Sequence, residues 1–260
     1  MIHIIFGLTG AGKTAYLVGQ AVPYLNNSDE CLTLLSNTEE QVNCLRCANG
    51  FDLSMPKHAP VYTNFDLRVD NGREIVSAYY IDGFHLGFEN PDVDIMPVYP
   101  GSKIFLSEAQ RYYNSRNKGL PDWVSRFYEE HRHFGLDIYL DCQRPQLIDA
   151  NIREITGDFI QMLNVDVMDG NTIFRFRRYN DWYDVNKCLS GSTVLPDIET
   201  AVVPFVVFDY YQSCCYYNEF IPKTDFWQVN HILGNSPAEI ELAKTMYRQI
   251  APKGFYKEKK

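Results

Sequence analysis

GLTGAGKT, residues 7–14, is the stretch that decides the fold. It satisfies the pattern GxxxxGK[ST] in full, between a β-branched run at residues 3–6 and a helical pattern from Lys13 to Tyr24. Glycines in such a loop let backbone N–H groups converge on phosphate oxygens, and the helix N-terminus that follows adds its positive dipole end. The stretch predicts a phosphate-binding loop, with the contact residues Gly7, Leu8, Thr9, Gly10, Ala11, Gly12, Lys13, Thr14 and Ala15.

Two side chains of this loop have predicted roles of their own. Lys13 is expected to reach the β and γ phosphates of a nucleoside triphosphate, and the Thr14 hydroxyl to bind magnesium. We therefore expect ATP as the substrate and Mg²⁺ as its companion ion.

Strand and helix patterns alternate over the first 155 residues, which favours a parallel sheet with helices on both faces. We expect an α/β fold of the RecA-like P-loop type. A core at residues 1–160 would be followed by a β-rich extension and a C-terminal helix at residues 161–260, packed on the same domain and ending in a basic tail. The extension is expected to contain a β-hairpin around Asp169-Gly170-Asn171. The further expected strands cover residues 60–67, 75–81, 103–106, 138–140, 159–168 and 172–179, and the further helices cover residues 121–135, 145–155 and 236–250.

Hydrolysis needs an acid that holds the magnesium shell and a carboxylate that orients the attacking water. Two strand ends compete for these roles. Residues 103–106 end at Ser107 and Glu108, and the strand that begins at Ile138 ends at Asp141. The pattern alone does not choose between Glu108 and Asp141.

Composition excludes several classes of protein. The 260 residues carry a net charge of -9, which argues against a broad nucleic-acid-binding surface and leaves only a local basic strip open. The N-terminal residues do not resemble a signal peptide, so we expect a cytoplasmic protein. The longest apolar run, residues 201–208, contains Pro204 and is far short of the ~20 residues that span a bilayer, so no transmembrane segment is expected.

The seven cysteines are expected to be reduced thiols, because the cytosol keeps disulfides rare. Cys44 and Cys47 form a CxxC pair, with Cys31 and His58 nearby as further candidate zinc ligands. The second CxxC or HxxxH pair of a zinc site is missing, which argues against structural zinc.

Four segments carry a resemblance to a known family: GLTGAGKT, VYTNF at residues 61–65, SEAQRYYNSR at residues 107–116, and LPDWVSRFYEEHRHFGLDIYLDCQRPQLIDANIRE at residues 120–154. In this order and spacing the chain resembles the zonular occludens toxin (Zot) N-terminal domain and the assembly ATPases of filamentous phages. These proteins belong to the FtsK/HerA-like branch of the P-loop NTPases.

The resemblance implies roles for residues outside the loop. The family's usual acidic pair followed by Ala-Gln stands here as Ser107-Glu108-Ala109-Gln110, which gives Glu108 the catalytic carboxylate role. Ser107 could still hydrogen-bond a magnesium-bound water, but it lacks the negative charge of an acid. Weaker magnesium binding and slower turnover are therefore expected than with an acid at this position. Gln143 is implied as a sensor of the γ-phosphate. Candidates for an arginine that completes a neighbour's site are Arg111, Arg116, Arg126, Arg144 and Arg153, of which we favour Arg153.

The function implied by the resemblance is an ATP-driven motor for assembly and extrusion of a single-stranded DNA phage through the host membrane. Its expected partners are further copies of itself in a ring, a phage coat or single-stranded DNA complex, and a membrane-embedded assembly protein. It would act at the cytoplasmic face of the host inner membrane. Two alternatives are a nucleotide-gated adaptor that does not hydrolyse ATP, suggested by Ser107, and a P-loop small-molecule kinase.

Overall fold

The computed structural model describes residues 1–26, 61–70, 75–81, 98, 101–116, 119–133, 135–192, 194–204 and 211–212. Three expectations lie outside these residues and are not tested by the structure. They are the zinc candidates Cys44 and Cys47, the helix at residues 236–250, and the basic C-terminal tail.

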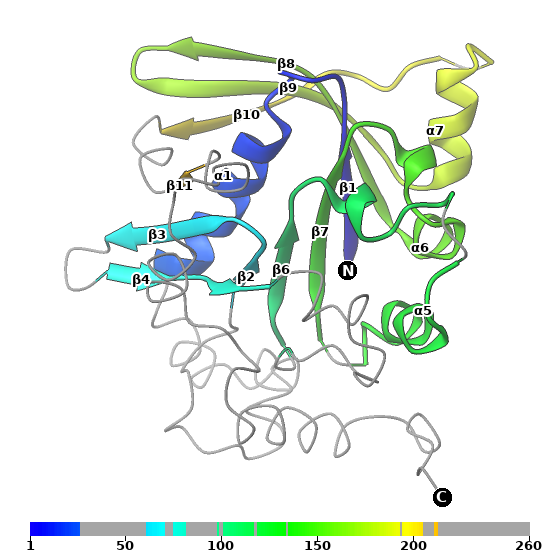
Figure 1. Ribbon diagram of the computed structural model, residues 1–260. Helices are drawn as coiled ribbons and strands as arrows, with labels where there is room; N and C mark the ends of the chain where they lie inside the picture. The colour runs from blue at the N-terminus through cyan, green and yellow to red at the C-terminus, as the bar shows by residue number, and fades with distance from the viewer. Residues whose placement is uncertain are drawn as a thin grey trace, which may run out of the picture.

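The described residues form an eight-stranded sheet with the order β10-β9-β8-β1-β7-β6-β2-β5 (Figure 1). Every neighbouring pair from β5 to β8 is parallel, and the β8-β9 and β9-β10 pairs are antiparallel. The expected α/β P-loop fold is confirmed. The strands of this sheet are β1 (Ile2–Phe6), β2 (Val61–Thr63), β5 (Tyr79–Tyr80), β6 (Lys103–Leu106), β7 (Asp137–Cys142), β8 (Asp158–Met168), β9 (Asn171–Tyr179) and β10 (Glu199–Pro204).

A smaller sheet has the order β11-β3-β4, with antiparallel pairing. It consists of β3 (Asp66–Asp70), β4 (Ile75–Ser77) and β11 (Tyr211–Gln212). The single strand expected at residues 75–81 is therefore divided between β4 in this sheet and β5 in the main one.

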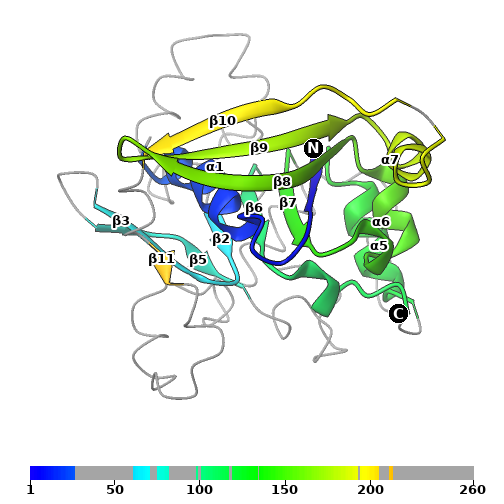
Figure 2. The same ribbon diagram turned by 90° about the horizontal axis from the view of Figure 1, so that it is seen from above.

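Helices cover both faces of the main sheet, as the alternating pattern predicted (Figure 2). Helix α1 (Lys13–Asn26) lies on one face, and α5 (Asp122–Glu129), α6 (Ala150–Ile155) and α7 (Trp182–Leu189) lie together on the other. Side chains alternate along each strand, so Ile4 packs in the cluster beneath α5 to α7 and Ile5 in the cluster beneath α1. No helix among the described residues is long and apolar enough to cross a bilayer.

The helix predicted over residues 145–155 is wrong in its extent. A 3₁₀ turn, η2 (Pro145–Leu147), is followed by two extended residues, Ile148 and Asp149, and only then by α6. Ile148 bridges to Asn114, and the Asp149 N–H donates to the Tyr113 carbonyl at 2.8 Å. Tertiary pairing thus interrupts the helix, and the Asp149 side chain caps its continuation by accepting from Asn151 N–H.

The helix that begins after Pro121 also ends earlier than predicted. Helix α5 stops at Glu129, and Glu130 leaves the helical region with φ -95° and ψ 5°. His131 is then buried, with its Nδ1 2.6 Å from the Tyr128 carbonyl oxygen. Burial lowers the pKa of His131 to about 4, so this imidazole is neutral at neutral pH and packs as part of the core.

The β8-β9 hairpin, expected around Asp169-Gly170-Asn171, packs on α1. Tyr16 of α1 makes an edge contact with Phe174, with ring centroids 5.5 Å apart. Gly19 faces Val203 of β10, and a Cβ added at Gly19 would lie 2.9 Å from the Val203 Cγ2. The antiparallel part of the sheet therefore covers the helix that follows the glycine-rich loop.

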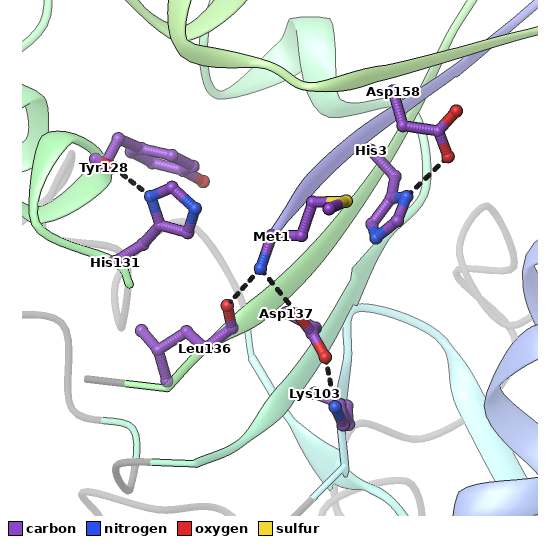
Figure 3. A network of polar contacts seen from close by, with 8 residues as sticks. All are labelled: Met1, His3, Lys103, Tyr128, His131, Leu136, Asp137 and Asp158. Atoms are coloured by element: carbon purple, nitrogen blue, oxygen red, sulfur yellow. Dashed lines mark hydrogen bonds and ion pairs between the residues drawn. The ribbon is translucent and has the colours of Figure 1, made fainter. Parts of the chain in front are cut away.

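Strands β1, β6 and β7 begin at the end of the sheet opposite that loop, where a polar network ties them together (Figure 3). Asp137, the first residue of β7, pairs with Lys103, the first residue of β6, and with the Met1 amino group. Burial raises the pKa of Asp137, but these two cations lower it more, so that it lies below its ordinary value. The network anchors the beginnings of β1, β6 and β7.

Candidate nucleotide-binding site

The glycine-rich loop joins the end of β1 to the start of α1, as the sequence predicted. Two glycines are required by its geometry. A Cβ added at Gly7 would lie 2.6 Å from the Met162 carbonyl oxygen, and one at Gly12, where φ is +82°, would lie 3.1 Å from Phe174. The loop is therefore pressed against β8 and β9, and only glycine allows that approach.

Lys13 lies back over the loop that precedes it. Its ammonium donates to the Leu8 carbonyl at 3.3 Å, and the Ala11 N–H donates to the same oxygen at 3.2 Å. Residues 8–10 are exposed, whereas Lys13 is only 7% exposed. A largely buried ammonium above an exposed glycine-rich turn is suited to bind phosphate oxygens.

Thr14 is the point where three elements meet. Its Oγ1 lies 3.1 Å from the Ser107 Oγ and 3.0 Å from the Asp141 Oδ2. The Ser107 hydroxyl also donates to that Asp141 oxygen, at 3.0 Å. The start of α1 and the carboxyl ends of β6 and β7 thus bring together two hydroxyls and one carboxylate.

The strand register explains why these side chains converge. Strands β6 and β7 are parallel and pair Leu106 with Leu140, so Ser107 and Asp141 occupy equivalent positions one residue further on. Leu106 and Leu140 both pack on the face opposite α1. Because side chains alternate, Ser107 and Asp141 both point to the α1 face, where Thr14 lies.

Asp141 is fully buried, and both of its carboxylate oxygens are engaged. Its Oδ1 accepts from the Glu108 N–H at 2.8 Å, and its Oδ2 accepts from the Thr14 and Ser107 hydroxyls. Burial raises the pKa of Asp141 to about 6, against the lowering effect of these three hydrogen bonds. The carboxylate is therefore predominantly ionised at neutral pH.

Glu108 stands in an unusual backbone conformation. Its φ of 53° and ψ of 43° lie in the left-handed region, at the start of the 3₁₀ turn η1 (Ala109–Arg111). For a non-glycine residue this conformation costs about 1–3 kcal/mol and persists only when its surroundings impose it. The Glu108 N–H donates to the Asp141 carboxylate, and the Glu108 carbonyl accepts from the Arg111 N–H. The Glu108 side chain is partly exposed and accepts from the Gln110 amide.

Asn64 is a structural residue of the site to which the sequence analysis gave no role. Its amide Oδ1 accepts from the Ser107 N–H and its Nδ2 donates to the Ser107 carbonyl, both at 2.8 Å. This two-point contact fixes the end of β6 from the neighbouring strand β2. Asn64 lies within VYTNF, one of the segments that carry the family resemblance. That segment is the feature of the sequence that could have pointed to Asn64.

The two remaining predicted site residues are Gln143 and Arg153. Gln143 is exposed directly after β7, which lies beside the loop strand β1. Arg153 is half-buried on α6, with its guanidinium 4.5 Å from the centre of the Trp182 ring. Within the chain this arginine is thus engaged in a cation-π contact with α7.

The donors around Thr14 fit magnesium, which prefers oxygen ligands and is usually held by one or two protein groups together with substrate phosphates. The described residues contain no group of three or more His, Cys, Asp and Glu that could hold a metal ion unaided. The hydroxyls of Thr14 and Ser107 beside the Asp141 carboxylate suit an ion that arrives with a nucleotide.

The parallel sheet and the GxxxxGK[ST] loop between β1 and α1 define the fold of the P-loop NTPases. The sequence model of the zonular occludens toxin (Zot) family matches residues 1–216. The chain therefore belongs to the Zot family, as the resemblance implied. No curated protein matches the chain.

The solved structures that are similar to this one include the following two. The N-terminal domain of zonular occludens toxin from Neisseria meningitidis is 21% identical, with a TM-score of 0.47, over 81% of this chain and 98% of that one. The genome packaging NTPase of Sulfolobus turreted icosahedral virus 2, in complex with AMPPCP, is 11% identical, with a TM-score of 0.36, over 76% of this chain and 95% of that one.

Proposed function

We propose that this chain is an ATPase that binds Mg-ATP on residues 7–14 and uses its hydrolysis to drive assembly and extrusion of a filamentous phage. The observation that carries the enzymatic part is the meeting of Thr14 with the carboxyl ends of β6 and β7. In this proposal residues 7–14 bind the phosphates, Thr14 lies on the metal side, and Glu108, which follows β6, activates the water. Zot family membership supports the phage-related part of the proposal.

Each residue has a stated task in this proposal. The loop N–H groups and Lys13 bind the phosphates, and Glu108 orients the attacking water and accepts its proton. Gln143 contacts the γ-phosphate. Magnesium, when bound, offsets the negative charge of the β and γ phosphates, and Thr14 would help to hold it.

A non-hydrolysing adaptor is the second candidate, because the neutral Ser107 stands where the family usually has an acid. Such a protein would bind ATP, assemble and recruit partners without turnover. Steady-state phosphate release, measured with and without single-stranded DNA, separates the two. Release that continues over many cycles supports the motor, whereas bound ATP without release supports the adaptor.

Self-association should control turnover if the active site is completed by an arginine of a neighbouring subunit, as in ring ATPases. Arg153 is our candidate for that arginine, so its stacking on Trp182 would have to open on assembly. We expect the activity per molecule to rise with protein concentration, in parallel with oligomer formation followed by sedimentation. Constant activity in a preparation that stays monomeric would contradict the ring.

The remaining expected partners are a coat or single-stranded DNA complex and a membrane-embedded assembly protein. The proposed place of action is the cytoplasmic face of the host inner membrane. Residues 161–204 belong, in this proposal, to the same rigid unit as the ATPase core, since β8, β9 and β10 pack on α1.

A further inference from the structure

The site carries a carboxylate that the assigned roles do not use. Asp141 is fully buried at the end of β7, and it forms no ion pair among the described residues. Its three hydrogen-bond donors are two hydroxyls and one backbone N–H, none of which is charged. A buried anion without a cation is costly, so its surroundings favour the arrival of positive charge.

The same carboxylate orients the two hydroxyls beside it. The Thr14 and Ser107 hydroxyls both donate to its Oδ2, each at 3.0 Å. Their oxygen lone pairs are then free on the other side. Two oxygens so presented, next to a negative charge, are suited to bind a cation or the water molecules around it.

We propose that Asp141, at the end of β7, supplies the negative charge on the metal side of this site. It would take the place of the acid that the family usually has at the position of Ser107, at the end of β6. Ser107 and Asp141 hold equivalent places on these neighbouring strands, and their side-chain oxygens are 3.0 Å apart. This inference rests on the proposed binding of Mg-ATP at residues 7–14.

Asp141 is a positioning residue in this account, and Glu108 remains the base. Both Asp141 oxygens are engaged and the residue has no exposed surface, so an attacking water cannot reach it. Glu108 is partly exposed, and its backbone N–H donates to Asp141 at 2.8 Å. The carboxylate on β7 thus serves both the metal side and the alignment of the base.

The test is the binding of a fluorescent ATP analogue by the full chain and by Asp141→Asn, measured in EDTA and over a magnesium titration. Asparagine can keep the bond from the Glu108 N–H through its oxygen and donate to the two hydroxyls, so folding should survive. Loss of the charge should raise the magnesium concentration for half-maximal binding by about 10- to 100-fold. In EDTA the affinity should be unchanged or higher, because repulsion of the triphosphate falls.

The matched control is Asp137→Asn, the same change at the other end of the same strand, which should leave the magnesium titration unchanged (Figure 3). The exchange variant Ser107→Asp with Asp141→Ser restores the family's usual arrangement and should recover the magnesium dependence. Ser107→Asp alone places two carboxylates side by side, and it should lower the melting temperature until magnesium is added.

The outcomes separate this inference from the proposed function. No binding of the analogue by the unmodified chain would overturn both. Normal binding with the same magnesium dependence in Asp141→Asn would overturn this inference alone, and so would an equal loss of affinity with and without the metal, which a purely structural role predicts. If Asp141→Asn does not fold, the magnesium titration of the exchange variant is the deciding measurement. A magnesium dependence of that variant that differs from that of the unmodified chain counts against the inference.

Discussion

Replacement of Lys13 by alanine is expected to weaken ATP binding by about 30- to 4,000-fold. The Lys13 ammonium is largely buried above the loop, where it would contact the phosphates in place of the Leu8 carbonyl. Truncating one member of such a buried charge pair costs about 2–5 kcal/mol, and each 1.4 kcal/mol is about tenfold in affinity. Equilibrium binding of a labelled ATP analogue measures the loss.

Lys103→Ala is the control for that experiment. Lys103 lies at the start of β6 and pairs with Asp137, at the end of the sheet opposite the loop (Figure 3). Its removal should affect stability through the lost ion pair and leave ATP affinity unchanged. Unchanged affinity in Lys13→Ala itself would mean that residues 7–14 do not bind the nucleotide.

Glu108→Gln is expected to retain ATP and to lose nearly all turnover, by about 10²- to 10⁴-fold, the range typical of a general base. Glutamine has almost the same shape, and its oxygen can still accept from Gln110, so the backbone at residue 108 should be preserved. The change removes the negative charge and, with it, the ability to accept a proton. Phosphate release and analogue binding, measured on the same preparation, distinguish lost chemistry from lost binding.

Glu199→Gln provides the matched control, since Glu199 is exposed on β10 and its carboxylate faces Arg178. Its turnover should equal that of the unmodified chain. Full turnover in Glu108→Gln would remove Glu108 from the role of base. The strand-end assignment carried over from the family would then be wrong.

The parts of the fold that depend on local sequence were predictable. Residues 103–106 form the expected strand because a short β-branched and aromatic run ends there at a polar pair. The hairpin around Gly170 followed from turn residues between two alternating runs. The loop at residues 7–14 was specified by its own glycines, two of which the packing against β8 and β9 requires.

The lateral arrangement of strands was not predictable from these patterns. The strand patterns alone placed Glu108 and Asp141 at two strand ends but could not show that β7 lies between β1 and β6. The structure brings Ser107 and Asp141, one from each of these strand ends, against Thr14. The interrupted helix at residues 145–155 has a similar cause, because the pairing of Ile148 with Asn114 is a contact between distant segments.

Steady-state phosphate release from Mg-ATP by the unmodified chain is the measurement that tests the central claim most directly. The account predicts release that continues over many cycles, requires magnesium, and disappears in Lys13→Ala and Glu108→Gln. The measurement should be made at protein concentrations where oligomers form and with single-stranded DNA present. Tight binding of ATP to residues 7–14 under these conditions, with no more phosphate release than the Glu108→Gln variant shows, would contradict the account.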